Sequence, residues 1–238
     1  MNAETLELSY GETRIEFNLL RRERKTLSIS VRPDLVVEVV APIDASLERV
    51  FEKVRKRAPW IMRQLQFFGQ FQPRTTERRY VSGETHLYLG RQYKLRVVPH
   101  VQQQVKLYRG ILVVQSHKAQ ENSRTKLLLE NWYKTRANLK FSERLELCRK
   151  RFPDPDEINP KSIVVRRLQQ RWGSMTPTGK LILNRSLIKA SVDALDYVIT
   201  HELCHIRHPH HGSAFFDFLD RVMPDWEHRK LKLERQLA

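Results

Sequence analysis

The stretch that decides the fold is His201-Glu202-Leu203-Cys204-His205, an H-E-x-x-H motif that is followed six residues later by His211. Residues four apart on an α-helix lie one turn apart on the same face, so the imidazoles of His201 and His205 can reach one metal ion. Glu202 lies about 100° around the helix from His201, where its carboxylate can hold a water without ligating the metal. Two imidazoles, one later ligand and a water form the open tetrahedral site of a zinc hydrolase.

The residues before the motif predict that it lies on a helix packed into a core. Ser191 or Asp193 can cap the N-terminus of this helix. Apolar residues then recur at helical spacing, and they are Leu195, Val198, Ile199, Leu203 and Ile206. Pro209 indicates that the helix ends near His208 and that the chain turns back there.

The third metal ligand is expected to follow that turn. His208 lies about 10 Å along a continuing helix from His201, which is too far for three imidazoles to converge easily. We predict His211, because its spacing from His201 equals that of the third histidine in H-E-x-x-H-x-x-G-x-x-H zinc proteases. His210 is the fallback. Because zinc also accepts carboxylate oxygen, three acidic residues remain as alternatives: Asp217, Asp220 and Glu227.

The bulk composition is that of an ordinary globular protein. A chain of 238 residues is long enough to bury a proper core. Its residues are 40% hydrophobic and 29% charged, as in other globular proteins. The chain has no apolar run long enough to span a membrane, and its first residues do not read as a secretory signal. The two cysteines, Cys148 and Cys204, do not make a disulfide framework, and we expect Cys204 to be a buried small hydrophobe. We therefore expect a cytoplasmic protein without membrane association; the oligomeric state stays open.

The net charge of +16 is the second notable feature. A field of this sign attracts nucleic acid or acidic partners, which makes nucleic acid a candidate partner. The alternative is that lysines and arginines simply solvate exposed faces. No zinc knuckle, Gly-rich phosphate loop or RNA-binding aromatic signature accompanies the charge.

The first part of the chain mixes strands with one helical stretch. Residues 26–31 and 35–40 flank the turn signal Arg32-Pro33-Asp34, which predicts a hairpin. Residues 45–71 have a helical apolar pattern, and Pro59 should kink or divide that helix. Residues 80–114 return to strands.

The second part begins with a long amphipathic helix over residues 120–151. Strands over 162–167 and 180–184 follow, with turn chemistry at Pro177-Thr178-Gly179. The metal-site helix comes next, and further helices are expected over 213–222 and from about Trp226. We expect an N-terminal strand-and-helix region over 1–118 and a catalytic domain over 119–238, unless the two form one continuous domain.

Several short motifs together resemble the YgjP-like metallopeptidase family, which is similar to the SprT-like and WLM zinc proteases. In the C-terminal part they are Arg171-Trp172-Gly173-Ser174, Gly179, Leu183-Asn184, Asp196-Tyr197-Val198-Ile199, the H-E-x-x-H motif and His211. In the N-terminal part they are Arg24-Lys25, Ser28-Ile29, Val39, Ala41-Pro42 and Trp60-Ile61. The chain departs from the family at Met175, where a small residue is common, and at His210-His211-Gly212, where Asn-His-Ser is usual.

The resemblance implies an α+β, zincin-like fold with a short sheet beside the motif helix and an N-terminal strand-and-helix extension. It implies Zn²⁺ as the cofactor and a peptide or protein as the substrate. Glu202 would then be the general base. Arg171, Trp172, Ser174 and Asn184 are candidate cleft-lining residues, and the strand ending at Asn184 could align an extended peptide. The alternative for Trp172 is a structural corner.

Three other functions stay open alongside a zinc metallopeptidase. The first is a metal-dependent nucleotide or phosphate-ester hydrolase, for which two metals would be expected. The second is a nucleic-acid-associated, SprT-like protease that uses the basic surface. The third is a non-catalytic zinc-binding protein, against which the intact Glu202 speaks, because a structural site needs no general base.

Overall fold

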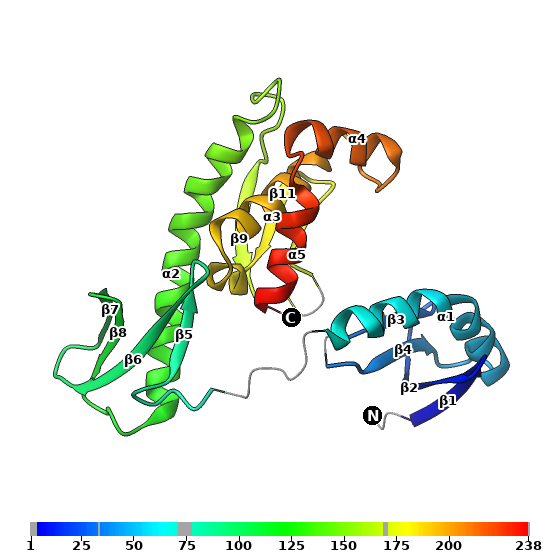
Figure 1. Ribbon diagram of the computed structural model, residues 1–238, viewed down its shortest axis with the longest axis horizontal. Helices are drawn as coiled ribbons and strands as arrows, with labels where there is room; N and C mark the ends of the chain where they lie inside the picture. The colour runs from blue at the N-terminus through cyan, green and yellow to red at the C-terminus, as the bar shows by residue number, and fades with distance from the viewer. Residues whose placement is uncertain (1–3, 33, 71–77, 169–170, 238) are drawn as a thin grey trace. The chain divides into compact units, whose positions relative to one another are not determined.

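The computed structural model describes residues 4–32, 34–70, 78–168 and 171–237. It contains two compact units, one over the described residues up to 70 and the other over 78–237 (Figure 1). These compact units differ in their bounds from the regions 1–118 and 119–238 expected from the sequence. No helix among the described residues is long and apolar enough to cross a membrane.

The first unit is a four-stranded sheet with one helix. Its elements are β1 (Glu4–Tyr10), β2 (Thr13–Arg22), β3 (Ser28–Val31), β4 (Val37–Pro42) and α1 (Leu47–Gly69). The strand order is β1-β2-β4-β3, in which only β2 and β4 are parallel. The expected hairpin of β3 and β4 is confirmed by its register, Val31 opposite Val37. Pro33, which belongs to the expected turn signal, lies outside the described residues.

Helix α1 continues through Pro59, so of the two expected outcomes, a kink or a division, the division does not occur. Val50 and Val54 on one side of the proline and Ala58 and Ile61 around it are all completely buried. One apolar stripe therefore packs along the whole helix. Tertiary burial of this kind outweighs the loss of one backbone hydrogen bond.

The second unit begins with a second four-stranded sheet. Its strands are β5 (Thr85–Tyr88), β6 (Arg91–Pro99), β7 (Gln104–Tyr108) and β8 (Ile111–Ser116), in the order β5-β6-β8-β7. One face packs against α2 (Asn122–Arg149), where Leu95, Leu112 and Val114 join the core that contains Leu129. Because this sheet shares its core with the long helix, it belongs to the second unit rather than to the N-terminal region.

A three-stranded sheet follows α2. It comprises β9 (Ser162–Arg166), β10 (Gly173–Met175) and β11 (Lys180–Asn184), in the order β10-β11-β9. The strand β10 was not expected from the sequence. It pairs antiparallel with β11, whereas β9 pairs parallel with β11. Since β11 has a neighbour on both sides, it cannot align a substrate at its edge, and that expectation is wrong.

The chain then forms η1 (Arg185–Lys189), α3 (Val192–Cys204), α4 (Ser213–Val222) and α5 (Trp226–Leu237). Of the two expected caps, Ser191 is the one observed, because its side chain accepts a hydrogen bond from Ala194 N–H at 3.4 Å. The helix ends at Cys204, one turn earlier than expected. The α+β fold, with a short sheet beside the motif helix, is confirmed (Figure 1).

A buried carboxylate ties α3 to α2. Asp196, only 2% exposed, accepts two hydrogen bonds from Arg144, at 2.7 and 2.6 Å, and one from Arg151 at 2.9 Å. These bonds to Asp196 raise the pKa of Arg144. The two guanidinium groups compensate the charge of Asp196, which a buried carboxylate requires.

We predict that Asp196→Ala will lower the free energy of unfolding by about 3–5 kcal/mol, because removing one partner leaves the other charges partly buried and unpaired. The control is Asp193→Ala on the same helix, whose side chain is 53% exposed and pairs with Lys232. It should cost at most about 1 kcal/mol. Denaturant unfolding measures both, and equal losses in the two variants would contradict the assignment.

Candidate metal centre

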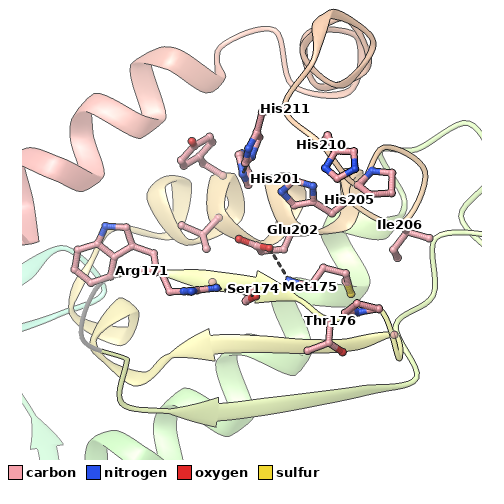
Figure 2. A pocket seen from close by; sticks show the side chains of 17 residues that line it. Arg171, Ser174, Met175, Thr176, His201, Glu202, His205, Ile206, His210 and His211 are labelled. Carbon is pink, nitrogen blue, oxygen red and sulfur yellow. Dashed lines mark hydrogen bonds between the residues drawn. The ribbon is translucent and has the colours of Figure 1, made fainter. Parts of the chain in front are cut away.

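Three imidazoles converge at the C-terminal end of α3. The nitrogens that His201, His205 and His211 offer as ligands all lie within 4.8 Å of one another. His201 Nε2 and His211 Nε2 are 3.0 Å apart. Figure 2 shows the three rings beside Glu202. The structure thus brings together the three predicted ligands from both sides of the turn.

The early end of α3 places His211. The N–H groups of Ile206, Arg207 and His208 bond back to the last carbonyls of the helix, at 3.0–3.2 Å. The chain then reverses, and α4 begins two residues after His211. Phe215 of α4 is completely buried, and its ring centroid lies 4.7–4.9 Å from all three imidazole centroids. Phe215 is therefore a common apolar support for the three rings.

The hydrogen bonding of the imidazole nitrogens in the cluster indicates metal ligands rather than side chains with a structural role. His201 Nδ1 is buried and has no hydrogen-bond partner among the described residues. Burial, together with His205 and His211, lowers the pKa of His201 to about 3, so this imidazole is neutral. His205 Nδ1 lies 3.0 Å from the His208 carbonyl oxygen, an arrangement that holds a proton on Nδ1 and leaves Nε2 as a ligand. Three imidazoles are a donor set that zinc accepts.

Glu202 is held beside the cluster by strand β10. Its side chain is buried, with the residue 7% exposed, and Oε2 accepts a hydrogen bond from Met175 N–H at 2.8 Å (Figure 2). A Cβ atom at Gly173 would lie 2.7 Å from Glu202 Cγ and 2.8 Å from Oε1. Burial raises the pKa of Glu202 to about 7, although the Met175 N–H and Arg171 both favour the charged form.

The cluster opens into a cleft of about 920 Å³. Arg171, Trp172 and Ser174 line this cleft, as predicted, whereas Asn184 does not. Asn184 is 4% exposed, and its amide donates to the carbonyl oxygens of Leu168 and Arg171, at 2.9 and 3.1 Å. Its role is therefore to hold the segment that carries Arg171, and its assignment to the cleft wall is corrected.

The alternative ligands lie outside the cluster. His210 lines the cleft but is not among the converging side chains. Within the described residues, no carboxylate joins the three histidines, and Asp220 instead accepts a hydrogen bond from Trp226 Nε1. Cys204 is completely buried, and burial raises the pKa of its thiol to about 12, which fits the expected inert hydrophobe.

Sequence reasoning did not predict the contacts that four residues make at the site. Gly173 and Met175 were seen only as part of a family motif and a departure from it, and their contacts with Glu202 depend on an unexpected strand. Phe215 lies four residues beyond His211, so the helical spacing after the last ligand was an available signal. Tyr197 lies four residues before His201 on the same helix face and lines the cleft. The centroids of the Tyr197 and His201 rings are 5.8 Å apart.

Comparison with known proteins identifies the family. One similar solved structure is that of the metallopeptidase zymogen of Pyrococcus abyssi, abylysin, which is 17% identical in sequence. The match covers 41% of this chain and 94% of that chain, and its TM-score of 0.35 is low. No curated protein matches. The sequence profile described as "YgjP-like, metallopeptidase domain" matches residues 25–236, which include every element of the cleft. This chain therefore belongs to the YgjP-like metallopeptidase domain family.

Proposed function

We propose that the protein is a zinc-dependent peptidase that hydrolyses peptide bonds with Glu202 as its general base. The observation that carries the proposal is the convergence of three imidazole nitrogens within 4.8 Å beside a buried carboxylate and an open cleft. Membership of a metallopeptidase family supports the reaction class. The metal and the role of each residue are inferences from geometry and chemistry.

His201, His205 and His211 would hold the metal. When bound there, zinc would supply a Lewis acid that polarises the scissile carbonyl and lowers the pKa of a coordinated water to about 7. The Phe215 ring contacts all three imidazoles, and the His208 carbonyl orients His205. These contacts restrict the orientations of the three rings before a metal binds.

Glu202 would move the proton. Its Oε2 is held by Met175 N–H, so proton exchange falls to Oε1. This oxygen accepts a proton from the attacking water and delivers it to the leaving amine. Burial raises the pKa of Glu202 towards neutrality, and a nearby cation would lower it again. The carboxylate is therefore positioned as a base that can also return its proton.

Strand β10 is the sheet edge that could align a peptide. Trp172 O accepts from Asn184 N–H, and Thr176 N–H donates to Lys180 O, so these residues face β11. Backbone groups alternate along a strand, so those of Gly173 and Met175 face away from β11. Met175 N–H is used by Glu202. The carbonyls of both residues and the N–H of Gly173 could bond an extended substrate.

The geometry favours a peptidase over the alternatives. Within the described residues, one cluster of three ligand side chains is found, as in a mononuclear site, whereas a phosphate-ester hydrolase is expected to use two metals. A structural zinc site is closed and has no use for a base, yet Glu202 borders an open cleft here.

We predict that His211→Ala will abolish stoichiometric zinc binding, because a three-ligand site loses one of its few bonds. His210→Ala is the matched control, because it removes the neighbouring imidazole, which lies outside the cluster. Metal analysis of both purified variants by mass spectrometry measures the effect. Retention of zinc by His211→Ala together with its loss from His210→Ala would show that the third ligand is misassigned.

We predict that Glu202→Gln will keep zinc content and thermal stability near wild type but lower peptide turnover by about 10²–10⁴-fold, since the shape is retained and the base is lost. Cleavage of a peptide library by metal-replete protein, read by mass spectrometry, supplies the measurement. Undiminished hydrolysis by this variant would refute the proposed mechanism.

We predict that Gly173→Ala will lower turnover by about 10²-fold, because the added methyl group meets the Glu202 side chain and displaces its carboxylate. Zinc content should not change. Gly69→Ala is the control, since a Cβ there meets nothing within 4 Å. If Gly173→Ala hydrolyses peptides at the wild-type rate, the close approach of β10 does not matter for catalysis.

A further inference from the structure

The positive charge of the chain is not shared evenly between its two units. Residues 4–70 contain 12 lysines and arginines against 10 acidic residues, whereas residues 78–237 contain 30 against 16. The segment from Thr85 to Ser116, which forms sheet β5–β8, is more extreme. It contains five basic residues and no aspartate or glutamate. The basic residues are Arg91, Lys94, Arg96, Lys106 and Arg109.

The register of this sheet places three of them on one face. Arg96 lies opposite Val113 of the central strand β8, and Val113 lies opposite Lys106 of β7. In the next row, Lys94 lies opposite Ile111, which lies opposite Tyr108. Because side chains alternate between the faces of a strand, these two rows share the face that Leu95, Leu112 and Leu107 do not use.

This face is exposed, and the opposite face is not. Leu95 and Leu112 pack into the core with α2, beside which the sheet lies in Figure 1. Lys94, Arg96 and Lys106 are exposed, and Tyr108 is 59% exposed. The Arg109 guanidinium lies 5.1 Å from the centroid of the Tyr108 ring. The aromatic ring is therefore presented to solvent with a cation beside it.

Among the described residues, the basic side chains of this face have no acidic partner. In the part of the chain that the structure describes, no ion pair engages Lys94, Arg96 or Lys106. Some arginines elsewhere in the same unit do form ion pairs, as Arg207 does with Asp154 and Glu157. Solvated faces ordinarily mix charges of both signs. A face without acidic residues is better explained by a polyanionic partner than by solvation alone.

We propose that this face of sheet β5–β8 binds single-stranded nucleic acid. Lys94, Arg96 and Lys106 would neutralise backbone phosphates, and Tyr108 would stack on a base. Basic groups that follow the backbone, combined with exposed aromatic rings, are the usual means of binding single strands without reading their sequence. Ile111 and Val113 lie on β8, between β6 and β7, and would give the bases a partly apolar floor. This binding does not depend on the proposed peptidase activity.

The test is fluorescence anisotropy of labelled oligothymidine and oligouridine of about 20 nucleotides, titrated with full-length protein at several salt concentrations. The triple variant Lys94→Gln, Arg96→Gln, Lys106→Gln is compared with the triple variant Lys53→Gln, Lys56→Gln, Arg57→Gln. The control removes the same charge from exposed positions of α1. Zinc content and melting temperature confirm that each variant is folded.

We expect the sheet variant to lose at least about tenfold in affinity near 100 mM salt, and its salt slope to fall by about 2, because each phosphate contact contributes about 0.7 for single strands. The α1 control should stay within about twofold of wild type, since its charges lie on the other unit. Tyr108→Ala should lose about fivefold or more without a change in salt slope, because stacking releases no counterions.

Three results would overturn the proposal. The first is absence of binding by the wild-type protein near 50 mM salt, where phosphate contacts are strongest. The second is an equal loss in the sheet variant and the α1 control. The third is that a duplex or a polyglutamate peptide binds as tightly as the single strands or more tightly, while Tyr108→Ala has no effect on affinity. That result would assign the face to another class of partner.

Discussion

Helix α3 must bury almost its whole length and still present two imidazoles to a cleft at its C-terminal end. Ten of its thirteen residues are buried, so the helix cannot rotate or shift without disturbing the core of the unit. Asp196 adds a directional restraint, because its three bonds to Arg144 and Arg151 join α3 to α2. The positions of His201 and Glu202 follow from this packing. The site is rigid because the helix that carries it is part of the core.

The close approach of β10 to α3 has a cost and a use. A buried carboxylate is unfavourable unless it is hydrogen-bonded, and Met175 N–H provides that bond to Glu202. The approach is possible because residue 173 has no Cβ. The same strand is the outer strand of its sheet, so one short segment orients the carboxylate and offers a free edge to the cleft. In the proposed mechanism, the positioning of Glu202 as the base and the alignment of a substrate would thus be physically linked.

The second unit carries both the cluster of His201, His205 and His211 and the excess of positive charge. Its sheet β5–β8 is joined to the rest of the unit through α2, and Tyr133 of that helix donates a hydrogen bond to the Leu87 carbonyl at 2.7 Å. The first unit has nearly balanced charge and its own core. The proposed binding of polyanions would therefore belong to the unit that carries the histidine cluster and not to the N-terminal unit.

The sequence by itself determined the local features. The H-E-x-x-H spacing, the Ser191 cap and the apolar stripe place two histidines on one face of a helix, because helical periodicity depends on neighbours in the chain. The family and the α+β class followed from the same motifs. The tertiary structure decided the rest. Pro59 stays inside a continuous helix because a buried stripe spans it, and β5–β8 joins the second unit because its apolar face packs on α2. Asn184 supports the cleft from within, and Gly173, Met175 and Phe215 shape it through contacts between distant segments. Such contacts depend on how elements pack, which no local pattern encodes.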